Sequence, residues 1–159
     1  RQFNMFCLPE ASPGTLTTIF ASILKGFLAT GFSDSVKNKQ EAAIKSTIEI
    51  YTRIQVELRA TPAKFHYSFN LRDVSKVVQG LCMVKPQVVP NDEVFFKLWV
   101  NESLRVFYDR LINEDDRNWF IDLCMELLQG NFRASPDKEE LFVTNKIMFG
   151  DLLRLDAPV

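Results

Sequence analysis

The chain has 159 residues, the length of one compact domain. Hydrophobic residues make up 47% and charged residues 25%, which is usual for a globular protein and excludes an intrinsically disordered chain. Nineteen basic and twenty acidic side chains give a net charge of −1. Proteins that bind phosphate backbones usually carry a strong basic excess, so no nucleic-acid partner is expected. Fourteen phenylalanines are the one compositional excess, and they predict an aromatic-rich core.

Cysteine and histidine usage limits the possible chemistry. Cys7, Cys82 and Cys124 are widely spaced and flanked by apolar residues, which predicts buried free thiols in a reducing compartment. With His66 as the single histidine, a His/Cys zinc site is not expected, and no metal is predicted. No apolar run reaches the roughly 20 residues of a membrane span, so no membrane partner is predicted. The chain begins without methionine or a signal peptide, and we interpret it as a piece of a larger protein.

The first predicted elements are a short strand and a buried helix. Residues 2–8 are apolar and aromatic and stop at Pro9, a pattern typical of a strand. Ser12 followed by Pro13 predicts a helix start, because serine caps helices and proline is tolerated in the first turn. Apolar side chains then recur at helical spacing over a broad face as far as Gly31, so this helix should be largely buried.

The composition changes after this helix. In residues 33–60, charged side chains alternate with a narrow apolar stripe. The pattern predicts one long amphipathic helix, capped by Ser33 or Ser35 and ending before Pro62. Residues 61–69 combine alternating aromatics with a proline and are predicted to form an extended connector or a short edge strand.

Three further helices are predicted in the second half. Asn70 predicts the start of the first, because asparagine is a good cap, and the charge of Asp73 suits its first turn. The second should run from Pro90-Asn91-Asp92 to about Ile112, and the third from the acidic turn at 114–116 to Gly130. The apolar positions expected to face inward in the first of these are Val74, Val77, Val78, Leu81 and Val84.

The predicted fold is mainly α: a bundle of about five helices with a short strand at the N-terminus. Residues 131–140 are predicted to be a polar loop, and Ile147-Met148-Phe149 a small strand.

A search for catalytic motifs finds none. The sequence contains no GxxxxGK[ST] phosphate loop, no GxSxG elbow, no HExxH pair and no CxxC. The acidic residues 114–116 suit a metal or paired-carboxylate site less well than a solvated helix cap. His66 is a possible general base, but no serine or cysteine can be placed beside it, so a structural role is favoured. We therefore identify no catalytic residue in this chain.

Arg72 is the one side chain placed for chemistry. It falls in the first turn of the helix predicted after Asn70, where free backbone N–H groups and the positive end of the helix dipole attract anions. Its planar, permanently charged guanidinium suits phosphate. The alternative is a surface arginine or one paired with Asp73, and spacing alone favours that alternative.

Two long strings of sequence carry a family resemblance. HYSFNLRDVSKVVQG (66–80) and LWVNESLRVFYDRLINEDDRNWF (98–120) resemble the end of the third AAA+ module in the motor ring of axonemal dynein heavy chains. The resemblance covers nearly the whole chain, since it also includes RQFNMFCLP (1–9), TIFASILKGFL (18–28) and IMFGD (147–151).

In that family an AAA+ module is an α/β ATP-binding domain followed by a small helical lid. The resemblance implies that residues 1–31 are the last strand and helix of the large subdomain, and that residues 33–159 are the lid and the lead toward the next module. It implies ATP and Mg²⁺ in the intact module, with the Walker motifs upstream of Arg1. This fragment is expected to be inactive alone and to bind no cofactor tightly.

The resemblance also assigns roles to single residues. Arg72 matches the arginine called sensor 2, which reaches from the lid toward the nucleotide phosphates, and Leu71 and Val74 are expected to line the adenine side. Arg1 matches the arginine offered to the nucleotide of the neighbouring module. Asn101 stands where the family commonly has a histidine, a change that a surface helix position should tolerate.

The function implied by the resemblance is that of a coupling element in a microtubule motor ATPase of cilia and flagella, located in the cytoplasm, cytoskeleton and axoneme. The partners would be adjacent AAA+ modules of the same heavy chain and, through other regions, microtubules and the intermediate and light chains. The alternative is a free-standing helical protein–protein interaction domain without nucleotide chemistry, which the phenylalanine excess would suit equally well.

Overall fold

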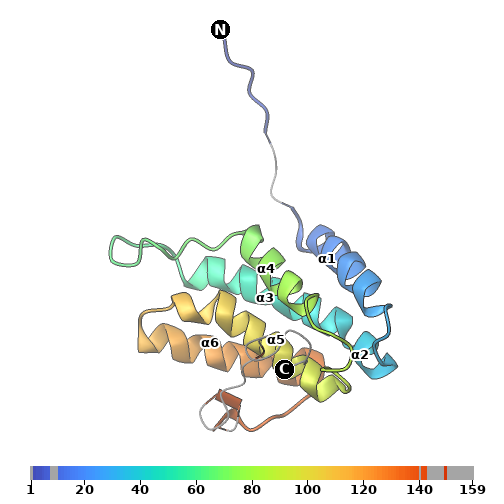
Figure 1. Ribbon diagram of the computed structural model, residues 1–159. Helices are drawn as coiled ribbons and strands as arrows, with labels where there is room; N and C mark the ends of the chain where they lie inside the picture. The colour runs from blue at the N-terminus through green and yellow to red at the C-terminus, as the bar shows by residue number, and fades with distance from the viewer. Residues whose placement is uncertain (1, 8–10, 140, 143–148, 150–159) are drawn as a thin grey trace.

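The computed structural model describes residues 2–7, 11–139, 141–142 and 149, and over these residues the fold is a helical bundle without strands (Figure 1). The mainly α fold is therefore confirmed. Five helices have 11 residues or more: α1 (Pro13–Leu28), α3 (Gln40–Glu57), α4 (Leu71–Leu81), α5 (Asp92–Val106) and α6 (Glu114–Leu127). Three shorter elements accompany them: α2 (Asp34–Asn38), the 3₁₀ turn η1 (Tyr108–Arg110) and, after α6, the π-helical turn η2 (Leu128–Phe132).

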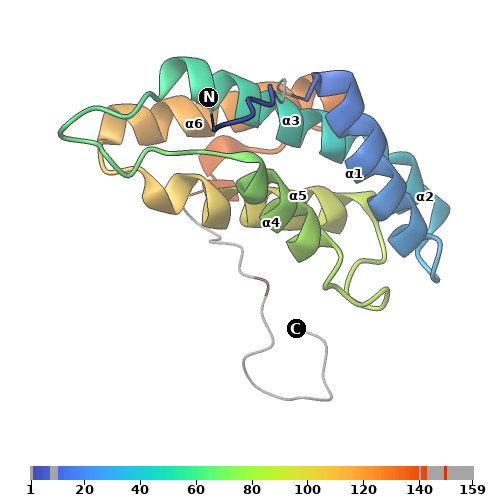
Figure 2. The same ribbon diagram turned by 90° about the horizontal axis from the view of Figure 1, so that it is seen from above.

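Helix α3 is the centre of the bundle and packs against every other α-helix. Seen from above, α3 and α6 lie in one layer and α4 and α5 in the next, while α1 and α2 close one end (Figure 2). The helices α4 and α5 are also in close mutual contact. This arrangement buries one face of α4 and leaves its other face at the surface, including Leu71 and Arg72 in the first turn.

The core is rich in aromatic side chains, as the composition predicts. Trp99, Phe107 and Phe120 are completely buried, and the ring centroids of the two phenylalanines lie 6.2 Å apart. The indole Nε1 of Trp99 donates a hydrogen bond of 2.9 Å to Oγ1 of Thr47, so the one polar atom of the largest core side chain is satisfied. The ring of Phe132 packs 5.0 Å from that of Trp99 and ties η2 to the core.

The start of α1 agrees with the prediction, whereas the strand before it does not form. The Ser12 hydroxyl accepts a hydrogen bond from the backbone N–H of Thr15, and Pro13 occupies the first turn. Residues 2–7 have no regular secondary structure, and Phe3 and Phe6 are 93% and 87% exposed. The strand prediction is wrong for these residues because a strand needs a neighbour for its backbone groups, and the described chain provides none.

The single long helix predicted over 33–60 is also wrong. The chain forms α2 and α3 with a break at Lys39, and α3 ends at Glu57. Ser33 precedes α2 without a capping hydrogen bond, and its hydroxyl instead donates to the carbonyl of Pro90 at 3.1 Å. At the break, the Lys39 ammonium donates to the carbonyl of Phe132 at 2.6 Å. These long-range contacts redirect the chain where local periodicity favours a continuous helix.

The last two predicted helices have different ends from those expected. Helix α5 stops at Val106, not at Ile112, and the 3₁₀ turn η1 follows. Gly130 does not end the last helix, because the chain continues as η2 and turns only at Arg133, where φ is 55°. The polar loop predicted from residue 131 therefore begins later. The small strand predicted at 147–149 lies outside the described residues except for Phe149, which is in no regular element.

The cysteines divide into three environments. Cys124 is fully buried, and burial raises the pKa of its thiol well above the usual range, which makes it unreactive. Cys82 is half-buried, and partial burial raises its pKa in the same direction. Cys7 is exposed, so the prediction of three buried thiols is wrong at this position, which belongs to the segment that lacks a partner strand.

Candidate functional site

The start of α4 is fixed by a capping box. The Asn70 side chain accepts a hydrogen bond of 2.9 Å from the backbone N–H of Arg72, and the Asp73 carboxylate accepts one of 3.0 Å from the backbone N–H of Asn70. Each side chain thereby satisfies a backbone donor that the helix itself leaves unpaired. The cap predicted from the sequence is confirmed, and it holds the first turn of α4 in one orientation.

Asp73 is buried and is neutralised by two cations. Only 4% of the residue is exposed, and its carboxylate lies 3.2 Å from Nη1 of Arg110 and 3.5 Å from Nζ of Lys76. A buried carboxylate requires such partners, because desolvation would otherwise be costly. Asp73 is therefore not the partner of Arg72, and this part of the alternative for Arg72 is wrong.

Arg110 fastens the connector at 61–69 to the start of α4. Its Nη2 donates to the carbonyls of Ser68 and His66 at 2.9 and 3.3 Å, and its guanidinium lies 4.6 Å from the ring centre of Phe69. The Nε2 of His66 is 3.2 Å from the carbonyl of Arg110 in return. These contacts give His66 a structural place between the connector and η1, in agreement with the interpretation favoured from the sequence.

Arg72 itself is exposed at the first turn of α4. Its backbone takes part in the cap, but within the described part of the chain its guanidinium has no hydrogen-bond or ion-pair partner. All of its side-chain donors are therefore available to a ligand. Leu71 beside it is 39% exposed and presents apolar surface, whereas Val74, also expected to line the adenine side, is completely buried.

A depression of about 330 Å³ adjoins Arg72. Four of its lining side chains are basic and one is acidic, so it has an excess of positive charge. The residues that line it are Ser68, Asn70, Arg72, Asp73, Lys76, Arg105, Val106 and Arg110. Guanidinium and ammonium donors beside a helix start suit the oxygens of a phosphate group, and we therefore regard this face as the candidate anion site.

Sequence reasoning found only Arg72 among these basic residues. Lys76 stands one helical turn after Arg72, and this spacing was a signal that could have been used. Arg105 and Arg110 belong to the end of α5 and to η1, more than 30 positions away in the chain, and no local pattern connects them with α4. Arg1, predicted to face the neighbouring module, lies outside the described residues.

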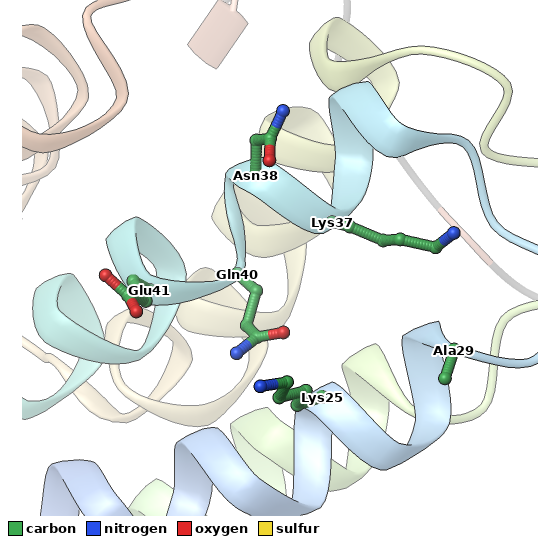
Figure 3. Close-up of a pocket in the computed structure, with 6 residues that line it drawn as sticks. All are labelled: Lys25, Ala29, Lys37, Asn38, Gln40 and Glu41. Atoms are coloured by element: carbon green, nitrogen blue, oxygen red, sulfur yellow. The ribbon is translucent and has the colours of Figure 1, made fainter.

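A second depression, of about 520 Å³, lies between the end of α1 and the junction of α2 with α3 (Figure 3). The side chains of Lys25 and Gln40 point toward one another across it, while that of Lys37 points away and binds Asp34 at 3.0 Å. Glu41 contributes a carboxylate to the same rim. Because its charges are mixed, this depression suits an anion less well than the face at the start of α4.

Other candidates for chemistry have structural partners. In the acidic turn, Asp116 accepts hydrogen bonds from Lys64 and, at 2.9 Å, from the hydroxyl of Tyr67, while Glu114 pairs with Arg117 at 3.1 Å. Over the described ranges no group of three or more His, Cys, Asp or Glu residues is placed to hold a metal ion. None of the helices described is both long enough and apolar enough to cross a membrane.

The fold and site define a small helical domain that presents a basic surface at the start of one helix. Its sequence matches the model of the family described as dynein heavy chain, ATPase lid domain, over residues 19–117, which is more than half of the chain. The chain belongs to this family. The resemblance to dynein heavy chains is thus confirmed, while the number of the module within the ring stays a prediction.

The relatives to which this chain is similar are axonemal dynein heavy chains. Dynein axonemal heavy chain 6 of Homo sapiens is 40% identical over 157 residues, covering 99% of this chain and 4% of that protein. Dynein axonemal heavy chain 12 of Mus musculus is 34% identical over 168 residues, covering 98% and 5% respectively. Dynein axonemal heavy chain 1 of Homo sapiens is 34% identical over 167 residues, covering 96% and 4%. The chain therefore spans only 4–5% of the length of these relatives.

Proposed function

We propose that this chain is the lid of the third AAA+ module of an axonemal dynein heavy chain, and that Arg72 contacts the phosphates of ATP bound in that module. The observation that carries the proposal is the exposed guanidinium of Arg72, which has no partner in the described chain and borders a basic depression. Family membership supports the lid assignment and makes a free-standing interaction domain the weaker interpretation.

The proposal places the chain in a microtubule motor of the ciliary and flagellar axoneme. Residues 33–159 would form the lid and the lead toward the next module, and Arg1 would face the nucleotide of the adjacent module. Neighbouring AAA+ modules would contact this chain directly. Microtubules and the intermediate and light chains would bind to other regions of the heavy chain. The names of the relatives support this location, since each is an axonemal heavy chain.

ATP with Mg²⁺, when bound in the large subdomain, would supply the anionic phosphates and the bond that is hydrolysed. The lid's part is to sense that charge. Arg72 would donate charge-assisted hydrogen bonds to phosphate oxygens, and Leu71 would add apolar contact on the adenine side, with Val74 buried behind it. Because a ligand shifts a conformational equilibrium only through contacts that differ between the two states, Arg72 is the contact through which the lid would respond.

The capping box explains how a contact at one side chain would move the whole lid. Arg72 is attached to a first turn held by Asn70 and Asp73, and Asp73 is tied to Arg110 of η1. The inner face of α4 is part of the buried core through Val77 and Leu81. A displacement of Arg72 toward the phosphates would therefore move the whole bundle as a rigid body, because close-packed interiors deform little.

The test is nucleotide binding by the intact heavy chain. The other modules would be silenced through their own phosphate loops, and affinity for a fluorescent ATP analogue would be measured for wild type, Arg72→Ala and Arg72→Lys. Loss of a hydrogen bond to a charged group should weaken binding by about 10- to 100-fold in Arg72→Ala. Arg59→Ala is the matched control, because Arg59 is also exposed but is not among the residues that line the depression. Equal affinity for wild type and Arg72→Ala would overturn the proposal.

A further inference from the structure

We infer that Arg105 is a second anion-binding arginine of the site at the start of α4, and that Glu102 is the residue that positions it. The inference rests on the proposed function and deepens it, because it names a further contact for the polyphosphate part of the ligand. Arg105 lies in the last turn of α5 and lines the same depression as Arg72. Its side chain is 55% exposed, so it is accessible to a ligand.

The orientation of Arg105 is set by one carboxylate oxygen. Both Nε and Nη2 of Arg105 donate to Oε2 of Glu102, the first at 3.0 Å. A guanidinium has five N–H donors in a fixed plane, so two bonds to one oxygen leave three donors for a ligand. A long side chain held in this way loses less conformational freedom on binding than a freely moving one.

Glu102 is itself held in place, because its carboxylate lies against Gly80 of α4, which has no side chain to exclude it. Glu102 is 6% exposed, and a Cβ atom added at Gly80 would lie 1.9 Å from its Oε2 and 2.4 Å from its Cδ. The other oxygen, Oε1, accepts a hydrogen bond of 3.2 Å from Asn101. Gly80 therefore provides the notch in which Glu102 lies, and Arg105 supplies the cation that a buried carboxylate requires.

The charges around the depression do not balance, and the excess is positive. Lys76 and Arg110 share the carboxylate of Asp73, and Arg105 has that of Glu102, while Arg72 has no partner in the described chain. Four cations thus face two carboxylates. Two arginines at one depression suit a chain of phosphates better than a single phosphate, because each planar guanidinium can bind two oxygens in parallel.

The experiment uses this chain labelled with ¹⁵N at arginine, with tripolyphosphate as the probe. We expect the Nε–H signals of Arg72 and Arg105 to shift together and saturate with one dissociation constant. Arg105→Ala should weaken tripolyphosphate binding by about tenfold, and Arg105→Lys should recover only part of this loss, because lysine keeps the charge but not the fork. Arg59→Ala should bind as the wild type does.

The outcomes separate the two proposals. If Arg72→Ala weakens binding and Arg105→Ala does not, the inference is wrong and the proposed function stands. If neither variant changes the affinity, the inference is wrong, and the proposed function is decided by ATP-analogue binding to the intact heavy chain. The role of Glu102 is tested with Glu102→Gln, which keeps the side-chain volume. Positioning predicts a lower ¹⁵N order parameter at Nε of Arg105 and weaker tripolyphosphate binding. An unchanged order parameter, or tighter binding from the lost negative charge, would overturn it.

Discussion

Helices α4 and α5 contribute both to the core around Trp99 and to the basic face at the start of α4, yet the two regions differ in burial and in charge. On the inner side of α4, Val77 and Leu81 are completely buried, as is Trp99 of α5. On the outer side, Arg72 and Lys76 reach the surface within the same 11-residue helix. The packing of the buried side chains fixes the position of α4. That position in turn places the exposed basic side chains. Changes to the core should therefore lower stability, whereas changes to the face should alter binding.

The largest effect on stability is expected in the core. Phe107→Ala removes a completely buried ring that packs against Phe69 and Phe120, and Trp99→Ala also removes the hydrogen bond to Thr47. Each should lower the free energy of unfolding by about 3–5 kcal/mol in chemical denaturation. Phe65→Ala is the matched control, since Phe65 is 79% exposed and should change stability by less than about 0.5 kcal/mol. A loss below about 1 kcal/mol for Phe107→Ala would contradict the burial seen here.

A smaller effect is expected at Asp73, which belongs to both regions. Asp73→Ala removes half of the capping box and leaves Arg110 without its carboxylate, so the free energy of unfolding should fall by about 2 kcal/mol. Asp109→Ala, at an exposed carboxylate, should have almost no effect in the same denaturation experiment. If both variants unfold at the same denaturant concentration, the cap does not stabilise the start of α4.

The surface ion pair between α3 and α6 should contribute less and should depend on pH. Both nitrogens of the Arg53 fork donate to Glu126, at 2.8 and 2.9 Å, and this hydrogen bonding holds the pKa of Glu126 below its ordinary value of 4.5. A lowered carboxyl pKa adds stability above the ordinary pKa, and this stability is lost as the pH falls through the lowered value. Glu126→Gln should therefore cost a few tenths to about 1 kcal/mol at pH 7 and nothing once Glu126 is protonated. Thermal unfolding of both proteins from pH 7 to pH 3 measures the difference, and a constant gap would contradict the assignment.

The smallest effect on stability is expected at Arg72. Its guanidinium is exposed and has no partner among the described residues, so Arg72→Ala should change the free energy of unfolding by less than about 0.5 kcal/mol. Chemical denaturation of Arg72→Ala and Phe107→Ala in parallel compares the contribution of the basic face to stability directly with that of the core. A loss above about 1 kcal/mol would show that Arg72 has a structural role.

Prediction from the sequence succeeded where partners are close along the chain. Ser12 with Pro13, and Asn70 with Asp73, mark helix starts because capping joins residues two or three positions apart. The position of Arg72 on the first turn of α4 follows from the second of these caps. The burial of Val77, Val78 and Leu81 on the inner face of α4 also follows, since helical spacing identifies an inner face before any partner is known.

The rest depended on contacts between distant segments. The break at Lys39, the 3₁₀ turn after α5 and the missing strand at 2–7 depend on what each segment packs or pairs with, and the local pattern does not contain that information. The site shows the same division. The sequence by itself determined the mainly α fold, the caps of α1 and α4, and the place of Arg72 on the first turn of α4. Only the tertiary structure brought Arg105 and Arg110 beside Arg72, because the packing of α4 on α5 and η1 joins groups that are separated by more than 30 residues.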